Sequence, residues 1–153
     1  MRARKKSPDE TRETQAIGRS RGGLSSKIHA TCDALGNPTG FHLTPGQAHD
    51  LQGADVLLDA LDEVDALIAD KAYDAQARVL EPVTAAGCQA VIPPKRCRQE
   101  PREYDRQMYK WRHLIENLFQ KLKQYRGIAT RYDKTARNFL GAIHLASIAI
   151  WLR

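Results

Sequence analysis

Two short apolar runs, each ended by a polar residue or by proline, constrain the fold of this chain most strongly. Residues 66–69 read ALIA and precede an aspartate, and residues 90–92 read AVI and precede two prolines. Short runs without polar alternation are typical of strands buried on both faces of a parallel or mixed sheet. The segments around them have helical character, so the chain is predicted to have an α/β fold, a mixed sheet flanked by helices.

The other elements follow from periodicity and turn residues. Residues 27–32 and 41–43 alternate apolar and polar side chains on either side of the turn sequence DALGNP, which predicts a β-hairpin. Helical spacing predicts helices over residues 50–61, 72–87, 107–125 and 134–152. The predicted order is therefore β-β-α-β-α-β-α-α.

The first 23 residues are charged and rich in glycine, serine and arginine, with almost no side chains suited to a core. This composition predicts a basic, irregular or disordered segment over residues 1–23, with the domain itself over residues 24–153. Arg19 and Arg21 are suited to phosphate contacts, although a solvated tail explains them equally well.

Charge and length limit the classes of function. The chain has 153 residues, enough for one domain with a core, and a formal net charge of +6. This balance favours a polyanionic partner, and nucleic acid more than a membrane surface. Three cysteines give no disulfide framework. The most apolar stretch, residues 139–152, is too short to span a bilayer, so we expect a cytoplasmic protein with no membrane partner.

The segment YKWRHLIENLFQKLK, residues 109–123, holds a single glutamate at the border between two faces of a predicted helix. At about 100° per residue, Tyr109, Arg112, Glu116 and Lys123 share one face. Glu116 is then either half of an ordinary ion pair with Arg112 or a carboxylate that reaches a cleft. A neighbouring apolar stripe is expected in the core: Trp111, Leu114, Ile115, Leu118, Leu122 and Tyr125.

Asp70 is the second carboxylate in an unusual position, because it directly follows the apolar run at 66–69. Ligand sites in open α/β sheets gather at the carboxyl ends of strands, which makes Asp70 a candidate metal ligand. The alternative is an N-cap of the following helix, a role that Asp74 could fill instead. If Asp70 and Glu116 converge, their oxygens suit Mg²⁺ or Mn²⁺, and pairs of such ions cut and join phosphodiester bonds.

These residues resemble the Y-(2)-R-(3)-E-(6)-K signature of DDE transposases of bacterial insertion sequences, of the insertion-sequence-five type. Tyr109, Arg112, Glu116 and Lys123 match the signature at every spacing. The sequence ADKAYD, residues 69–74, is similar to the block around that family's second catalytic aspartate, which would be Asp70. The resemblance extends from about residue 5 to residue 153.

The resemblance implies a ribonuclease-H-like fold and DNA strand cleavage and strand transfer at the ends of the element, dependent on Mg²⁺ or Mn²⁺. It also implies assembly as a homo-oligomer on DNA. Asp70 and Glu116 would be the catalytic metal ligands. The residues expected to contact DNA are Tyr109, Arg112, Lys123, Lys71, Arg19 and Arg21.

One part of the family pattern has no match. The family's first catalytic aspartate lies on a central strand between the hairpin and the Asp70 strand. The acids before the hairpin, Asp9, Glu10 and Glu13, lie in a hydrophilic segment with no strand pattern. We therefore expect the C-terminal part of a transposase, truncated or joined by frameshifting to an upstream reading frame, and inactive alone. The alternative is a non-catalytic DNA-binding or oligomerising fragment that regulates transposition.

Overall fold

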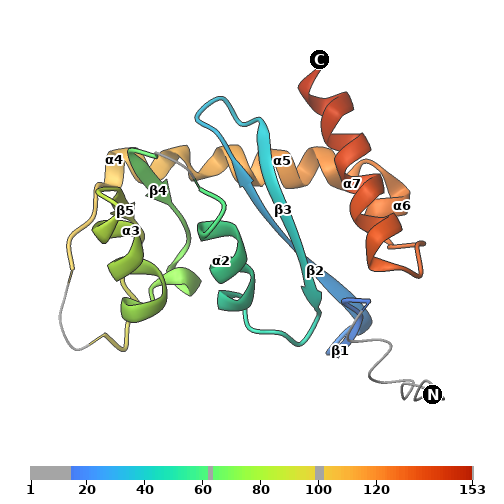
Figure 1. Cartoon of the computed structure of the whole chain (residues 1–153), viewed down its shortest axis with the longest axis horizontal. Helices are drawn as coiled ribbons and strands as arrows, with labels where there is room; N and C mark the ends of the chain where they lie inside the picture. The colour runs from blue at the N-terminus through green and yellow to red at the C-terminus, as the bar shows by residue number, and fades with distance from the viewer. Residues whose placement is uncertain (1–14, 62–63, 99–101, 153) are drawn as a thin grey trace, which may run out of the picture.

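The computed structural model of the chain describes residues 15–61, 64–98 and 102–152. They form a mixed α/β structure in which strands build two small sheets and helices join them (Figure 1). The elements in chain order are β1 (Gly18–Ser20), β2 (Gly23–Cys32), β3 (Pro38–Pro45), α2 (Leu51–Leu58), β4 (Ala66–Ile68), η1 (Lys71–Tyr73), η2 (Gln76–Leu80), α3 (Glu81–Ala85), β5 (Gln89–Val91), α4 (Arg106–Tyr109), η3 (Lys110–Arg112), α5 (His113–Lys123), α6 (Arg126–Ala129) and α7 (Ala136–Trp151).

The hairpin that alternation predicts is confirmed. β2 and β3 pair antiparallel over residues 26–32 and 38–45. Gly36 in the connecting turn has a φ of 83°, which glycine adopts without strain. The alternation separates two faces of the hairpin: Ile28 packs toward the buried side chains of α5 and α7, whereas His29 lies against α2.

A third strand, β1, extends this sheet within the segment that was predicted to lack regular structure. Gly18–Ser20 pairs antiparallel with the start of β2. The segment is fixed by Arg131, whose guanidinium donates hydrogen bonds to the carbonyls of Gln15 (2.6 Å) and Ala16 (2.8 Å). Local composition cannot report a contact between residues 116 positions apart, so the expectation fails here. The rest of that prediction, over residues 1–14, lies outside the described residues.

The second sheet is the parallel pair β4 and β5, with three residues in each strand. Both strands lie where the apolar runs predict them. The run at 66–69 predicted a strand buried on both faces, but Ala66, Leu67 and Ile68 are only half-buried. Within the described residues β4 has a strand neighbour on one side alone, which leaves its other edge uncovered.

The chain between these two strands does not form the single helix predicted over 72–87. It forms the 3₁₀ turn η1, the π-helical turn η2 and the short helix α3. Pro82 near the start of α3 lacks the N–H that a continuous helix would need, so the regular hydrogen-bond pattern is interrupted there. The segment ends as predicted at Gly87, which has a φ of 74°.

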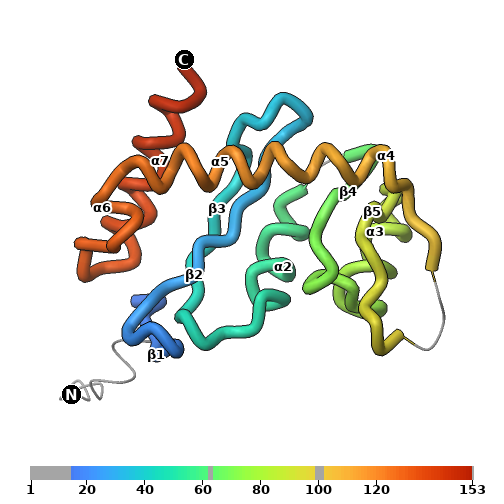
Figure 2. Tube along the Cα trace, turned by 180° about the vertical axis from the view of Figure 1, so that it is seen from behind, coloured from blue at the N-terminus to red at the C-terminus, as the bar shows by residue number. Residues whose placement is uncertain are grey.

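Buried apolar side chains form two clusters, one for each sheet. The hairpin core consists of Leu118, Leu122, Ile128, Phe139, Ile143 and Ala146, from α5, α6 and α7, against one face of the hairpin. The parallel core consists of Leu51, Ala54, Val79, Leu80, Val83, Cys88 and Ile92. Helices join the two halves: α2 touches the hairpin and η2, while α4 touches β5 and α5 touches β2 (Figures 1 and 2).

The helix predicted over 107–125 corresponds to the run α4, η3 and α5, which spans residues 106–123 and contains one 3₁₀ turn. Leu118 and Leu122 are buried as expected, each 1% exposed, but Trp111 is 56% exposed and its predicted burial is wrong. A helical wheel identifies the apolar side of a helix, not the length over which a neighbour covers it.

Helix α7 matches the prediction over 134–152, whereas α6 was not predicted. In the described part of the chain, no helix has the length and apolarity needed to cross a membrane.

Candidate acidic site

Asp70 lies where β4 ends and the turn η1 begins. Its backbone is extended, and one carboxylate oxygen, Oδ1, accepts a hydrogen bond from the N–H of Ala72. The N-cap alternative is therefore true of Asp70. A carboxylate has a second oxygen and further lone pairs, so this hydrogen bond orients Asp70 and leaves Oδ2 for another partner.

Glu116 lies in the first turn of α5, and its side chain is 50% exposed. Its Oε1 accepts a hydrogen bond from the guanidinium of Arg112, which also lies over the ring of Tyr109 at 5.7 Å from the ring centroid. Of the four signature residues, three therefore form a chain of contacts: Arg112 lies between Tyr109 and Glu116 and touches both. Lys123 follows two turns later on α5 and is exposed.

Tyr109 connects the two carboxylates electrostatically. Burial raises the pKa of the Tyr109 hydroxyl, Arg112 lowers it, and the negative charges of Asp70 and Glu116 both raise it. Charges act on one another appreciably only at short range in salt solution. Asp70, at the end of β4, and Glu116, on α5, therefore both raise the pKa of the same tyrosine.

Two tyrosines near this site were not predicted from the sequence. Tyr104 packs edge-to-face on Tyr109, with 5.5 Å between the ring centroids. Burial raises the pKa of Tyr73, and Asp50 and Asp70 raise it further. Tyr73 lies within the segment ADKAYD, whose similarity to the family's second aspartate block could have marked it as a site residue. Nothing in the local sequence pattern singles out Tyr104.

Asp74 does not have the capping role considered for it. Its side chain is 2% exposed and forms an ion pair with Arg98 at 2.5 Å. Asp74 Oδ2 also accepts a hydrogen bond from the N–H of Lys95 (2.7 Å), and Arg102 lies 3.9 Å from Oδ1. A buried carboxylate needs such compensation, so Asp74 fastens the segment after β5 to η2. Its partners follow more than 20 residues later, beyond the reach of local patterns.

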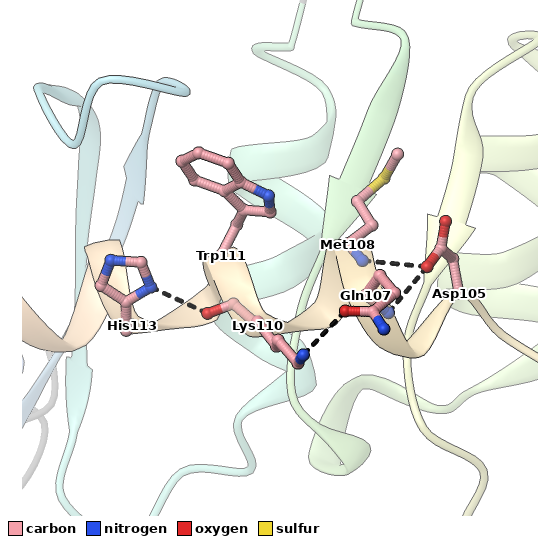
Figure 3. Close-up of a pocket in the computed structure, with 6 residues that line it drawn as sticks. All are labelled: Asp105, Gln107, Met108, Lys110, Trp111 and His113. Atoms are coloured by element: carbon pink, nitrogen blue, oxygen red, sulfur yellow. Dashed lines mark hydrogen bonds between the residues drawn. The ribbon is translucent and has the colours of Figure 1, made fainter.

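A shallow pocket on the same helical run is separate from the acidic site. Figure 3 shows its lining residues Asp105, Gln107, Met108, Lys110, Trp111 and His113. Asp105, the one carboxylate among them, already accepts hydrogen bonds from the N–H groups of Gln107 and Met108 (2.8 and 2.9 Å) as the N-cap of α4. Other polar groups that line the pocket form hydrogen bonds with near neighbours in the chain; Lys110, for example, donates to the side-chain oxygen of Gln107. The pocket offers an exposed tryptophan but no acidic cluster.

The donor chemistry of Asp70 and Glu116 fits a hard divalent cation, since each keeps one carboxylate oxygen without a described protein partner. Among residues 15–61, 64–98 and 102–152, no three His, Cys, Asp or Glu side chains gather closely enough to hold a metal ion. Two carboxylates alone do not complete a coordination shell, so a cation held by Asp70 and Glu116 would need further oxygens from elsewhere.

The other residues expected to contact DNA divide into two places. Lys71 follows Asp70 and is exposed. Arg19 lies on β1 and Arg21 in the turn after it, both exposed, at the far side of the molecule from α4 (Figures 1 and 2). The structure therefore brings together Tyr109, Arg112 and Glu116 and places the β1 arginines elsewhere.

Comparison with known proteins agrees with the signature residues and extends over the chain. The family model described as "Transposase DDE domain" matches residues 1–152. The chain belongs to the transposase DDE domain family. This transposase domain is also 41% identical, over 130 residues, to a protein of Brucella ovis named "Putative transposase for insertion sequence element IS6501". The match covers 85% of this chain and 100% of that protein. No solved structure matches the domain.

Proposed function

We propose that this transposase domain binds Mg²⁺ or Mn²⁺ through Asp70 and Glu116 and supports DNA strand cleavage and strand transfer at the ends of an insertion sequence. The observation that carries the proposal is the chain of contacts on one helical face, where Arg112 donates a hydrogen bond to Glu116 and lies over the ring of Tyr109. Membership of the transposase family implies DNA as the partner. A ribonuclease-H-like fold would account for a carboxylate at the end of β4 and for helices α4 and α5, which touch β5 and β2 respectively.

The chain's own residues hold the carboxylates in place. The N–H of Ala72 orients Asp70, and the guanidinium of Arg112 orients Glu116. Arg112, Lys71 and Lys123 supply positive charge around these acids, where a phosphodiester of DNA would bind. Divalent cations held by Asp70 and Glu116 would supply activation of an attacking oxygen and stabilisation of a leaving oxygen.

We further propose that an extended segment carrying a third carboxylate completes the sheet between the hairpin and β4. Two features of the described residues support this. β2 along Lys27–Cys32 has a strand partner only in β3, and β4 has one only in β5, so each sheet has an unpaired edge. Exposed edges of this kind favour pairing with a further strand. The upstream segment would come from fusion by frameshifting, and the enzyme would act as a homo-oligomer on DNA.

The strand-cleavage reaction tests the proposal. The chain joined in frame to the upstream segment is incubated with terminal-repeat DNA, with and without Mg²⁺. Cleavage is expected for the joined protein, and its loss is expected for Asp70→Asn and Glu116→Gln while DNA binding persists. Asp59→Asn and Glu81→Gln make the same chemical changes at exposed positions and should cleave normally. Normal cleavage by the joined Glu116→Gln protein would contradict the assignment.

The second candidate is a DNA-binding fragment that regulates transposition without cleavage. It is favoured by the absence, among the described residues, of any group of three His, Cys, Asp or Glu side chains that could hold a metal ion, since a two-metal site needs more ligands than Asp70 and Glu116. DNA binding by the 153-residue chain, together with inhibition of the joined enzyme and no cleavage with any divalent metal, would support this role. Efficient cleavage by the unjoined chain would exclude it.

A further inference from the structure

A basic surface lies where the helices α5, α6 and α7 meet. Residues 121–137 contain six Lys/Arg and one acidic residue, a net charge of +5, whereas the whole chain carries only +6. This segment is therefore strongly basic for its length. Five of these cations are exposed and define the basic corner: Lys121, Lys123, Arg126, Lys134 and Arg137.

The basic corner is a built feature rather than a flexible run. The sixth cation, Arg131, is partly buried, and its guanidinium lies 4.8 Å from the centroid of the Phe139 ring and donates to the carbonyls of Gln15 and Ala16. These contacts fix the turn between α6 and α7, and α6 in turn touches both α5 and α7. The exposed cations are therefore displayed on a fixed framework.

Nothing described neutralises these charges within the chain. None of the five cations of the basic corner forms an ion pair with a carboxylate of the described residues. Tyr132, in the same turn, is 64% exposed. Exposed aromatic rings interleaved with Lys and Arg are typical of surfaces that bind nucleic acid, because the rings contact sugars or bases while the cations contact phosphates.

We propose that the basic corner binds the phosphate backbone of duplex DNA a few nucleotides away from the acidic site. The inference rests on the proposed function, which supplies DNA as the partner. Helix α5 sets the spacing: Lys123 lies seven residues after Glu116, which is about 10 Å at 1.5 Å per residue. Successive phosphates of one DNA strand are about 3.4 Å apart along the duplex axis. The basic corner therefore begins about three nucleotides from Glu116.

Two triple variants with the same change in charge test this surface. Arg126→Gln, Lys134→Gln and Arg137→Gln remove three cations of the basic corner. Arg96→Gln, Arg106→Gln and Lys110→Gln remove two exposed arginines and one exposed lysine from elsewhere. Binding of each full chain to a short random-sequence duplex is measured by fluorescence anisotropy from about 50 to 200 mM salt, and circular dichroism checks folding.

The basic-corner variant is expected to bind at least tenfold more weakly at low salt. The slope of log affinity against log salt should fall in magnitude by about 2 to 3, since each lost phosphate contact contributes about 0.9. The control triple variant should keep the slope of the original chain. Equal behaviour of the two variants would overturn the proposal, because net charge alone would then explain binding. Loss of binding to anionic lipid vesicles, with binding to DNA unchanged, would also overturn it.

The same titration separates this inference from the proposed function. Asp70→Asn and Glu116→Gln should leave the salt slope unchanged, because neither carboxylate contacts phosphate as a cation does. If the basic-corner variant keeps a steep salt slope, the proposed role of the basic corner is wrong, but the proposed role of Asp70 and Glu116 is unaffected. Absence of any DNA binding by the original chain contradicts both.

Discussion

The hairpin half and the parallel half of the molecule use strands in different ways. β2 and β3 pair over seven positions, and their alternating side chains contact α5 and α7 on one face and α2 on the other. β4 and β5 pair over three positions, and β4 is half-buried throughout. The hairpin is thus a long, largely covered element, whereas the parallel pair is short and incompletely covered.

The difference bears directly on the acidic site. Asp70 belongs to the parallel half, at the end of β4, while Glu116 belongs to α5, which packs in the hairpin core. No strand pairing joins the two sheets among the described residues, so the packing of helices and connecting segments holds the two halves together. A substitution that loosens the packing of either half should therefore displace Asp70 relative to Glu116, even when the substituted residue contacts neither carboxylate.

The largest expected effect is in the hairpin core. Phe139 is 2% exposed, and Phe139→Ala should lower the free energy of unfolding by about 3–5 kcal/mol through loss of burial and creation of a cavity. Leu145→Ala, on the same helix but 70% exposed, is the control and should be nearly neutral. Urea denaturation followed by circular dichroism measures both. Similar losses for the two variants would mean that α7 does not pack as described.

The next largest effect is expected in the parallel half. Asp74→Asn keeps the shape of the side chain but leaves Arg98 without its buried partner, which should cost about 3 kcal/mol of unfolding free energy. Asp55→Asn makes the same change in an exposed ion pair with Arg78 and should have a much smaller effect. Equal losses in urea denaturation would show that the Asp74 cluster is not buried in solution.

A smaller effect is expected where α2 joins the halves. A Cβ at Gly53 would lie 2.2 Å from Cγ of His29, so Gly53→Ala should push α2 off the hairpin. The net cost is expected to be about 1–2 kcal/mol, because overpacking is partly offset by the better helix propensity of alanine. Gly141→Ala in α7 meets nothing within 4 Å and should instead stabilise the chain slightly. Destabilisation of the same size at both positions would refute this close approach.

The smallest effect is a pH dependence at the same contact. Burial lowers the pKa of His29 below its usual 6.5, with Lys27 and His42 adding to this and Asp50 opposing it. Below pH 6.5 the unfolded chain binds a proton that the folded chain does not, so stability should fall as pH falls through this window. The slope cannot exceed about 1.4 kcal/mol per pH unit for one proton. Urea midpoints at several pH values should show less of this slope in His29→Gln, and an unchanged slope would contradict the assignment.

The sequence predicts the elements whose signals are local. The hairpin, both parallel strands, α2, α7 and most of the run containing Glu116 were located from alternation, apolar runs and helical spacing. Leu118 and Leu122 were correctly placed in the core for the same reason. The spacing of Tyr109, Arg112 and Glu116 also predicted that these side chains meet on one face.

The features that were missed depend on distant contacts. Trp111 has the periodicity of a core residue, but its burial requires a neighbouring element that the described residues do not provide at that end of α5. Strand β1 and the buried role of Asp74 depend on Arg131 and Arg98, which come much later in the chain. Periodicity specifies which side of an element is apolar, and only the tertiary structure determines what covers it.

Residue-resolved amide hydrogen exchange tests most directly the proposal that a further strand completes the sheet between the hairpin and β4. In the 153-residue chain, the amides of β2 and β4 that do not bond to β1, β3 or β5 should exchange quickly, while the paired amides of the same strands exchange slowly. In the chain joined to the upstream segment, both sets should be protected. Strong protection of the edge amides in the unjoined chain, or no gain of protection on joining, would contradict the account.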